Sequence, residues 1–376
     1  MDRKILTVMF GGPSVEHDVS VITAMQVMKN ADPDKYHIAP LYWAKDGSFY
    51  TKDTTESFTE FQKRINTHPV KNSFEYQMIH QKAPGVLFSR ADYRPDVILP
   101  CFHGTSGEDG AIQGLLEVVD VPYAGSGVRA SAAGMDKVLF KALMKENNIP
   151  VLDYQVVTKE SGIDAKTLKF SFPVIVKPAH LGSSIGVQKC EGIQQAQEAL
   201  EVVFELDTHA LVEPYLKDKQ EVNVSVLGTT DDCQASVTEE PLSAEEILSF
   251  EDKYLRGKGK GGSKSVAGMA SHDRRIPAPI EKNYELRITN YAKEIFKVCG
   301  CSGVTRVDFL IDKKSNEIYV VEINTIPGSL SFYLWEAKGL SFRDLIDKLV
   351  ENAEYEYAKK KKLLRTFEST ILDKKI

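Results

Sequence analysis

The stretch 305–328 carries the residues best suited to chemistry. Two runs rich in Val, Ile and Phe flank a short polar break of Lys, Ser and Asn, which predicts a β-hairpin. Arg306 and Asp308 lie two positions apart on the first strand, and Glu322 and Asn324 on the second, so each pair shares a face. Two carboxylates and an amide on adjacent strands predict a site for Mg²⁺, which prefers oxygen ligands.

Arg306 adds a cation to the same face. A cation beside two carboxylates fits a strongly anionic ligand, such as a triphosphate, lying between them. The alternative is a salt-bridged hairpin rim, which is the usual state of charged residues on strands. The rest of the chain favours the metal site.

The composition bounds the class of protein. With 376 residues the chain is long enough for two or three domains, and its 42% hydrophobic content is ordinary for a soluble globular protein. A net charge of −6 argues against nucleic acid as the main partner. Five scattered cysteines predict reduced thiols in a cytoplasmic protein. We expect no membrane segment, because no apolar run reaches the ~20 residues that a span needs.

The N-terminal segment predicts a βαβ unit, with strands at 5–10 and 36–43 around a helix at 19–28. The turn GGPS after the first strand lacks the full GxGxxG spacing, so a dinucleotide site is only weakly indicated. Glu16 follows this turn, where ligands of such sheets bind, and its carboxylate suits a substrate ammonium. The alternative is a helix-capping cluster, because Asp18 is a good N-cap residue.

Two further loops have the composition of binding sites. HGTSGEDG follows a predicted strand at 96–102, and His103 at its start is a candidate for substrate contact, although a hydrogen-bonded loop histidine is commoner. Lys177 ends another predicted strand and is followed by PAHLGSSIGV. This is not a Walker A loop, but its backbone N–H groups and hydroxyls are suited to capping phosphates. Between the two, the pattern changes at 122–127, where we place a domain boundary.

The C-terminal part contains one long irregular segment. Residues 249–275 are rich in Gly, Lys and Arg and show little periodicity, which is typical of a disordered loop or a functional lid, and the positive charge favours a lid over phosphates. A helix predicted over 342–357 ends in the lysines 359–362. We expect these as a solvated last turn that complements the helix dipole.

Taken in order, the motifs resemble those of the D-alanine–D-alanine ligases, a family of the ATP-grasp superfamily. They are GGPSVEHDVS, HGTSGEDGAIQG, PYAGSG with MDK, VIVKPAHLGSSIGV, EDKY, and RVDF with VEINTIPG, and they cover nearly the whole chain. The resemblance implies an α/β (α+β) ATP-grasp fold of three domains. These are an N-terminal Rossmann-like domain at 1–125, a central lobe at 126–217, and a C-terminal lobe at 218–376 with a mobile lid at 249–275. ATP lies between the last two.

The resemblance also implies a reaction for peptidoglycan precursor synthesis. One D-alanine carboxylate attacks the γ-phosphate of ATP, and the amine of a second D-alanine displaces phosphate from the acyl phosphate. Two Mg²⁺ ions, or Mn²⁺ in their place, would bridge the phosphates on Asp308, Glu322 and Asn324. ATP would contact the phosphate-binding Lys137 and Lys177, the adenine-binding stretch with Glu213, Tyr215 and Leu216, the ribose-binding Glu221, and Lys253, which reaches the γ-phosphate.

The catalytic roles follow from the same motif matches. Glu16 would bind the ammonium of the first substrate, in a hydrogen-bonded network with Ser183 and Tyr254. Arg306 and the backbone N–H of Gly328 would stabilise the oxyanion. His103 would lie near the acyl phosphate.

Two departures from the family pattern concern the lid and the second substrate. The lid is unusually rich in Gly and Lys. The segment after Gly328 is shorter than the family's usual form, and Ser329 or Ser331 would take the serine role at the second substrate's carboxylate. Tyr254 accompanies an amine acceptor in this family. The alternatives are a sibling ligase that uses D-serine, D-lactate or another amino acid, and a nucleotide-binding regulatory protein. The resemblance suggests a homodimer.

Overall fold

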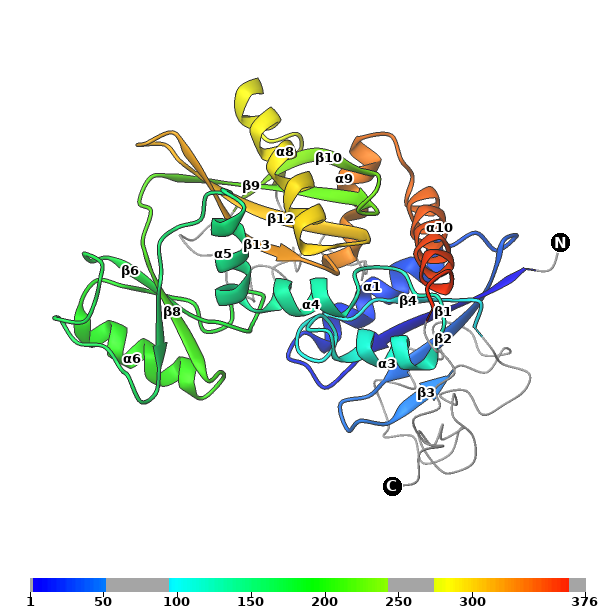
Figure 1. Cartoon of the computed structure of the whole chain (residues 1–376), viewed down its shortest axis with the longest axis horizontal. Helices are drawn as coiled ribbons and strands as arrows, with labels where there is room; N and C mark the ends of the chain where they lie inside the picture. The colour runs from blue at the N-terminus through cyan, green and yellow to red at the C-terminus, as the bar shows by residue number, and fades with distance from the viewer. Residues whose placement is uncertain (1–2, 52–94, 243–273, 365–376) are drawn as a thin grey trace, which may run out of the picture.

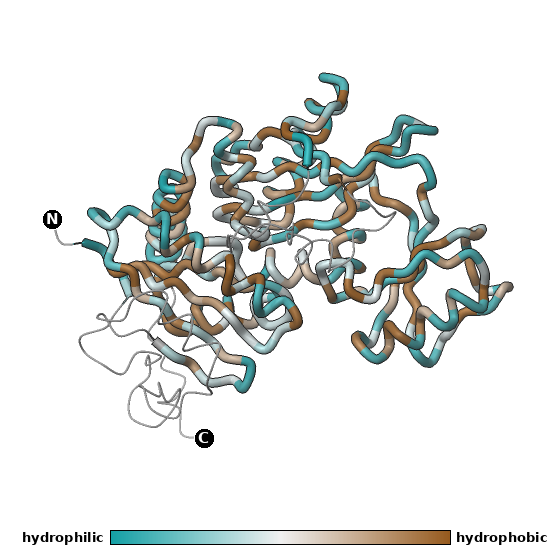
Figure 2. The backbone as a smooth tube through the Cα atoms, turned by 180° about the vertical axis from the view of Figure 1, so that it is seen from behind, coloured by the Kyte–Doolittle hydropathy of each residue, from teal (hydrophilic) through white to brown (hydrophobic). Residues whose placement is uncertain are grey.

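The computed structural model describes residues 3–51, 95–242 and 274–364. Its strands form three separate sheets, which Figure 1 shows side by side with helices packed on them. In Figure 2 the apolar stretches follow the strands and the packed helix faces, whereas the peripheral turns are hydrophilic. The predicted α/β (α+β) fold class is confirmed. The predicted domain limits of 1–125, 126–217 and 218–376 stay a prediction.

The first sheet contains the predicted βαβ unit. β1 (Lys4–Gly11) pairs in parallel with β2 (Tyr36–Trp43) and β4 (Val97–Pro100), and β3 (Phe49–Thr51) adds an antiparallel edge. Both α1 (His17–Asn30) and the loop after β4 therefore begin at the carboxyl ends of neighbouring parallel strands. This arrangement brings Glu16 and His103, distant in sequence, to one edge of the sheet. α3 (Ala111–Val119) follows that loop.

The second sheet is antiparallel and small. Its order is β5 (Gln155–Thr158), β8 (His209–Pro214), β6 (Val174–Pro178) and β7 (Gln188–Cys190), and α6 (Ile193–Phe204) packs on it. The predicted strand that ends in Lys177 is β6. Two helices connect this sheet with the first, α4 (Val128–Met135) and α5 (Lys137–Glu146). Asp136 caps α5 by accepting hydrogen bonds from the backbone N–H groups of Val138 and Leu139.

The third sheet has the order β11-β10-β9-β12-β13 and contains the predicted hairpin. β12 (Gly303–Asp312) and β13 (Glu317–Asn324) pair antiparallel, which confirms that prediction. The other strands are β9 (Lys219–Gly228), β10 (Cys233–Pro241) and β11 (Arg274–Arg275). α8 (Lys282–Cys299) packs on this sheet, and the chain continues through η2 (Gly328–Ser331), α9 (Phe332–Ala337) and α10 (Phe342–Lys361).

The C-terminal helix α10 packs against the first sheet along its buried face. Leu345, Ile346 and Leu349 belong to the same buried core as Leu6 and Phe10 of β1. The lysines of its last turn are about half exposed, as predicted for a solvated turn, and they also form ion pairs: Lys359 pairs with Asp231 at 2.5 Å, Lys360 pairs with Glu117 and Lys361 with Asp120. These lysines attach α10 to α3 and to the β9–β10 turn.

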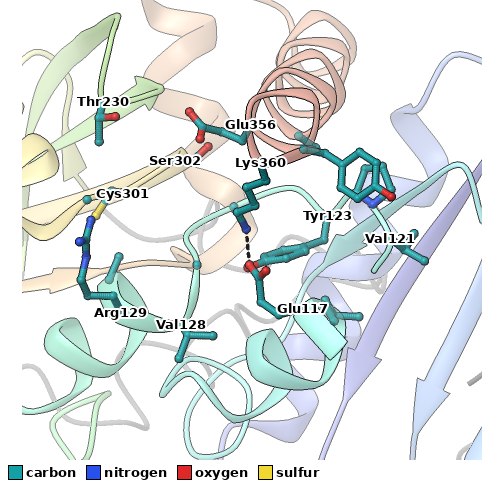
Figure 3. A pocket seen from close by; sticks show the side chains of 18 of the residues that line it. Glu117, Val121, Tyr123, Val128, Arg129, Thr230, Cys301, Ser302, Glu356 and Lys360 are labelled. Carbon is teal, nitrogen blue, oxygen red and sulfur yellow. Dashed lines mark hydrogen bonds and ion pairs between the residues drawn. The ribbon is translucent and has the colours of Figure 1, made fainter. Parts of the chain in front are cut away.

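The Lys360–Glu117 pair borders a cavity of about 400 Å³ (Figure 3). The cavity lies between α3, α4, α10 and the start of β12. Tyr123 also donates a hydrogen bond to Glu117, at 2.7 Å. The lining of this cavity contains none of the predicted site residues.

No helix in the described ranges combines the length and the apolar character needed to cross a membrane.

Candidate functional site

The hairpin of β12 and β13 brings the four predicted polar residues together. Asp308 lies directly opposite Glu322, and Arg306 opposite Asn324. Arg306 donates two hydrogen bonds of 2.7 Å to Asp308, one to each carboxylate oxygen. Asn324 donates a third, at 3.2 Å. Both side chains of the Arg306–Asp308 pair are about nine-tenths buried, so this two-pronged contact fixes the orientation of the carboxylate.

A β-bulge in the hairpin determines which way Glu322 points. The register shifts between Asp308 and Phe309, so that Val321 is the additional residue on β13. Before the bulge Ile318 and Val320 are buried, whereas after it Ile323 is buried. The alternation therefore changes phase, and Glu322 faces the cleft instead of the core.

The cleft lies between the second sheet and the hairpin and holds a cavity of about 170 Å³. Leu152, Ile175 and Leu310 give it apolar walls. Most of the predicted nucleotide and metal residues line it, namely Lys137, Lys177, Glu213, Tyr215, Leu216, Glu221, Asp308 and Glu322. A flat apolar group and a polyphosphate could therefore both be accommodated, the first by the apolar walls and the second by the lysines.

Two lysines hold Glu213 at the end of β8. Lys177 and Lys141 each place Nζ at 2.7 Å from a different oxygen of this carboxylate. Burial alone would raise the pKa of Glu213, but the charges of Lys177 and Lys141 lower it to about 2. Burial and the charge of Lys177 lower the pKa of Lys141, against the raising effect of Glu213. With two lysines for one carboxylate, this wall of the cleft carries excess positive charge.

Lys137 connects the helix α5 with both sides of the cleft. Its Nζ donates a hydrogen bond of 2.5 Å to the carbonyl oxygen of Leu181, in the Gly/Ser-rich loop between β6 and β7 (residues 179–187). The same Nζ lies 3.6 Å from the carboxylate of Glu322. Burial lowers the pKa of Lys137, and Lys177 adds to that effect, whereas Glu322 opposes it. The lysine is therefore already positioned between the loop and a predicted metal ligand.

Glu16 and Ser183 meet although they are 167 positions apart. The Ser183 hydroxyl donates to the Glu16 carboxylate, and Glu16 is buried. Gly104 makes this approach possible: its φ is +77°, and an added Cβ would lie 2.3 Å from Ser14 Oγ and 2.8 Å from Glu16 Oε2. The first sheet and the Gly/Ser-rich loop of the second sheet are thus joined at this carboxylate.

Glu108 is a second acid at the same place. Its carboxylate accepts a hydrogen bond of 2.7 Å from the backbone N–H of Gly104. Burial, followed by the negative charge of Glu16, raises the pKa of Glu108 well above its ordinary value. Of the two acids, Glu108 therefore holds its proton more readily, which favours Glu16 as the carboxylate that binds a cationic substrate group.

His103 is buried behind this pair of acids. Its Nε2 lies 2.9 Å from the Thr23 hydroxyl, and Thr23 in turn accepts a hydrogen bond of 3.1 Å from the backbone N–H of Ser329. Burial, and then the charge of Arg306, lower the pKa of His103 to about 3. The imidazole is therefore neutral in the physiological range and serves as a hydrogen-bonding group rather than as a cation.

Replacing His103 with glutamine is expected to flatten the dependence of stability on pH. Because the folded pKa is about 3 and the unfolded value is ~6.5, only the unfolded chain gains this proton between those values. This contribution is complete above pH ~6.5 and is lost as pH falls towards 3, with a slope of at most about 1.4 kcal/mol per pH unit.

Denaturant unfolding at a series of pH values between 4 and 7 tests the sign and the slope. His37→Gln, on β2, is the matched control and should retain the slope of the unsubstituted chain. An equal slope in the His103→Gln chain would contradict the burial of a neutral imidazole.

The backbone around Gly328 has an unusual conformation. Ser329, Leu330 and Ser331 have φ between 50° and 54°, which is rare for residues with a side chain. The Ser331 hydroxyl is buried and has no hydrogen-bond partner among the described residues. Strain and an unsatisfied hydroxyl at one place are typical of a ligand-binding segment.

The residues present fit Mg²⁺ and ATP. Asp308 and Glu322 supply carboxylate oxygens across one hairpin, and Asn324 uses its amide nitrogen for Asp308, which leaves its oxygen available. This is a set of hard oxygen donors, as Mg²⁺ requires. Because Lys137 and Lys177 line the same cleft, the phosphates of a nucleotide would meet cations from both the protein and the metal.

Two predicted residues, Lys253 and Tyr254, lie outside the described residues, as does nearly all of the predicted lid at 249–275. Lys141, Glu108 and Thr23 were not predicted. Lys141 lies four positions after Lys137 on α5, so helical periodicity could have placed it on the same face. Glu108 lies within a loop that the sequence did indicate, whereas Thr23 gives no signal.

Family models match most of the chain. The model described as D-ala D-ala ligase N-terminus matches residues 5–126, and the one described as D-ala D-ala ligase C-terminus matches residues 143–351. The D-alanine--D-alanine ligase of Thermosipho africanus is 37% identical over 376 residues, with 98% of each chain covered. That of Thermosipho melanesiensis is also 37% identical, over 383 residues, with the same coverage.

Solved structures agree with these relatives. The D-alanine-D-alanine ligase from Coxiella burnetii is 27% identical with a TM-score of 0.77, covering 97% of this chain and 98% of that one. VanG D-Ala:D-Ser ligase from Enterococcus faecalis is 28% identical with a TM-score of 0.78, covering 94% and 100%. The ATP-grasp fold predicted from the motifs is confirmed. The chain belongs to the D-alanine–D-alanine ligase family of ATP-grasp enzymes.

Proposed function

We propose that this enzyme joins two D-alanine molecules to D-alanyl-D-alanine with hydrolysis of ATP to ADP and phosphate, for peptidoglycan synthesis. A carboxylate oxygen of the first D-alanine attacks the γ-phosphorus of ATP and ADP leaves. The amine nitrogen of the second D-alanine then attacks the carbonyl carbon of the acyl phosphate. The C–N bond forms, the C–O bond to phosphate breaks, and the amine loses its proton.

The contact between Glu16 and Ser183 carries this proposal. It places a buried carboxylate, suited to the ammonium of an amino acid, at the loop that borders the nucleotide cleft. Glu108 supports the assignment, because its raised pKa favours Glu16 as the acid of the pair that carries the negative charge. The carboxylate of an amino acid held there would be directed towards the phosphates.

The charged residues of the cleft would position the nucleotide and neutralise its charge. Lys137 and Lys177 would contact phosphate oxygens, and Asp308, Glu322 and Asn324 would hold Mg²⁺. The bound metal ions would polarise the γ-phosphate and shield its negative charge from the attacking carboxylate. Arg306, fixed by its two bonds to Asp308, would stabilise the oxyanion together with the backbone N–H of Gly328.

The second substrate would meet the segment after Gly328. Ser331 is the better of the two serine candidates, because its buried hydroxyl lacks a hydrogen-bond partner in the described residues. Nearby, Tyr333 donates to Glu239 at 3.1 Å, and Arg274 pairs with the same acid at 2.7 Å. We propose Ser331 as a donor to the carboxylate of the second D-alanine.

Measuring phosphate release together with the mass of the product tests both the reaction and the identity of the acceptor. The purified chain receives ATP and Mg²⁺ with D-alanine alone, with D-alanine plus D-serine or D-lactate, and with L-alanine. We expect turnover and a D-alanyl-D-alanine mass with D-alanine alone, and no turnover with L-alanine. A mixed product in preference to the D-alanine dipeptide would assign a sibling ligase, and silence in every arm would contradict the reaction.

Two further parts of the proposal rest on the family resemblance: a cytoplasmic location and a homodimeric state.

A further inference from the structure

Three side chains of the second sheet lie close together near the start of the Gly/Ser-rich loop. His180 opens the loop after β6, Asp207 ends the turn after α6, and His209 begins β8. One possible ligand atom from each lies within 4.8 Å of those of the other two. None of the three lines the ATP cleft.

The Asp207 carboxylate is held in place by the backbone. It accepts hydrogen bonds from the N–H groups of His180, at 2.7 Å, and His209, at 3.2 Å. Its side chain is only 5% exposed, whereas that of His180 is 39% exposed and so reachable from solvent. A buried carboxylate, oriented by two backbone N–H groups, therefore lies at the base of an accessible cluster.

The two imidazoles are also oriented. The Thr208 hydroxyl lies 2.9 Å from Nδ1 of His209, which leaves Nε2 for a ligand. His180 has a carboxylate at each ring nitrogen, with Asp207 2.8 Å from Nδ1 and Asp136 3.6 Å from Nε2. With Nδ1 of His180 and Asp207 both on the ion, Nε2 faces the carboxylate of Asp136. Such an outer carboxylate is what metal-bound histidines usually have.

We propose that His180, Asp207 and His209 form a binding site for one divalent transition-metal ion of the Zn²⁺ class. Two imidazoles and one carboxylate suit Zn²⁺, Co²⁺ or Ni²⁺, whereas Mg²⁺ and Ca²⁺ prefer all-oxygen sites. Three protein ligands leave a position for water. The site is separate from the predicted Mg²⁺ site, because the two share no residue.

The bound ion would hold together two segments that border the nucleotide cleft, namely the start of the Gly/Ser-rich loop and the start of β8. The backbone already connects them: Ala179 N–H donates to the carbonyl of His209, and Lys137 N–H to that of Ala179, both at 3.0 Å. Asp136, beside the imidazole of His180, caps the helix that starts with the phosphate-binding candidate Lys137. The ion would therefore stiffen the start of the Gly/Ser-rich loop and the start of α5 together.

Co²⁺ titration of the full-length, chelator-treated protein, without ATP or Mg²⁺, tests the site. Four-coordinate Co²⁺ with imidazole ligands absorbs strongly in the visible range, whereas Co²⁺ on an all-oxygen site such as Asp308 and Glu322 absorbs weakly. We expect one strongly absorbing Co²⁺ per chain, displaced by Zn²⁺. His209→Ala and His180→Ala should each abolish this absorption, and His37→Ala, on β2, should leave it unchanged.

Crystals soaked in Zn²⁺ give a second readout that does not depend on how the variants fold. An anomalous peak at the zinc absorption edge between His180, Asp207 and His209 is expected. Absence of strong Co²⁺ absorption, absorption that persists in both histidine variants, or a zinc peak found only elsewhere, such as on a cysteine, would overturn the proposal.

Discussion

Replacing Asp308 with asparagine is expected to lower kcat/KM for D-alanine by a factor on the order of 10³, or about 4 kcal/mol of transition-state stabilisation. The change removes one predicted metal ligand and the charge that fixes Arg306, whose two hydrogen bonds of 2.7 Å both end on this carboxylate. Two functions are lost at once, because the same group would hold the ion and orient the oxyanion-stabilising cation. Phosphate release at several Mg²⁺ concentrations measures the loss.

The control for this variant is Asp312→Asn at the end of the same strand. Asp312 lies opposite Glu317 and accepts hydrogen bonds from Lys314 and Ser315 in the exposed turn. Its replacement should change the free energy of unfolding by no more than about 0.5 kcal/mol and leave kcat/KM unaltered. Because Asp308→Asn also weakens a buried ion pair, circular dichroism must show that the variant is folded at the assay temperature. Equal kcat/KM for the two folded variants would show that Asp308 holds no catalytic metal ion.

Replacing Glu213 with glutamine is expected to destabilise the folded chain by about 3–5 kcal/mol, because the change removes one partner of a buried ionic group. Lys141 and Lys177 would then lie buried without their shared carboxylate, which now forms an ion pair of 2.7 Å with each. Without Glu213, whose charge raises the pKa of Lys141, that pKa should fall, so the positive charge available to ATP phosphates falls too and the KM for ATP rises. Chemical denaturation and ATP titration measure the two effects.

The pH dependence of stability separates the charge of Glu213 from its shape. The folded pKa of about 2 lies below the ordinary value of ~4.3, so Glu213 stabilises the folded chain fully above that value. The contribution is lost as pH falls from ~4.3 towards 2, and the glutamine variant should lack it. Glu240→Gln, which breaks a pair with the exposed Arg275, is the control and should cost at most about 1 kcal/mol. A similarly small loss of folding stability in both variants would contradict the buried ion pairs of Glu213 with Lys141 and Lys177.

Part of the site could be predicted from the sequence because it depends on contacts along one strand. Arg306 and Asp308 share a face by the two-residue period, and their hydrogen bonds follow from that. The hairpin itself follows from two apolar runs around a polar turn. The glycine-rich loops indicated where the backbone approaches another group closely, and Gly104 beside Glu16 is such a position.

Other parts could not be predicted from a local pattern. The direction in which the Glu322 side chain points depends on the β-bulge at Val321. This bulge shows only in the pairing register of β12 and β13. The raised pKa of Glu108 depends on Glu16, which comes from a different strand end. The lysines that end α10 were predicted to be solvated and are about half exposed, but no local pattern indicates that Lys361 pairs with Asp120, 241 positions away.

The sequence by itself determined the secondary structure of the catalytic elements, the chemical types available to the site and the family. It did so because periodicity depends on neighbouring residues, and the order of the motifs is read directly along the chain. Only the tertiary structure decided which charges meet, as with Lys141 and Glu213 or with His180, Asp207 and His209. The strength and pKa of such groups depend on burial and on distances between segments, and packing of the whole chain sets both.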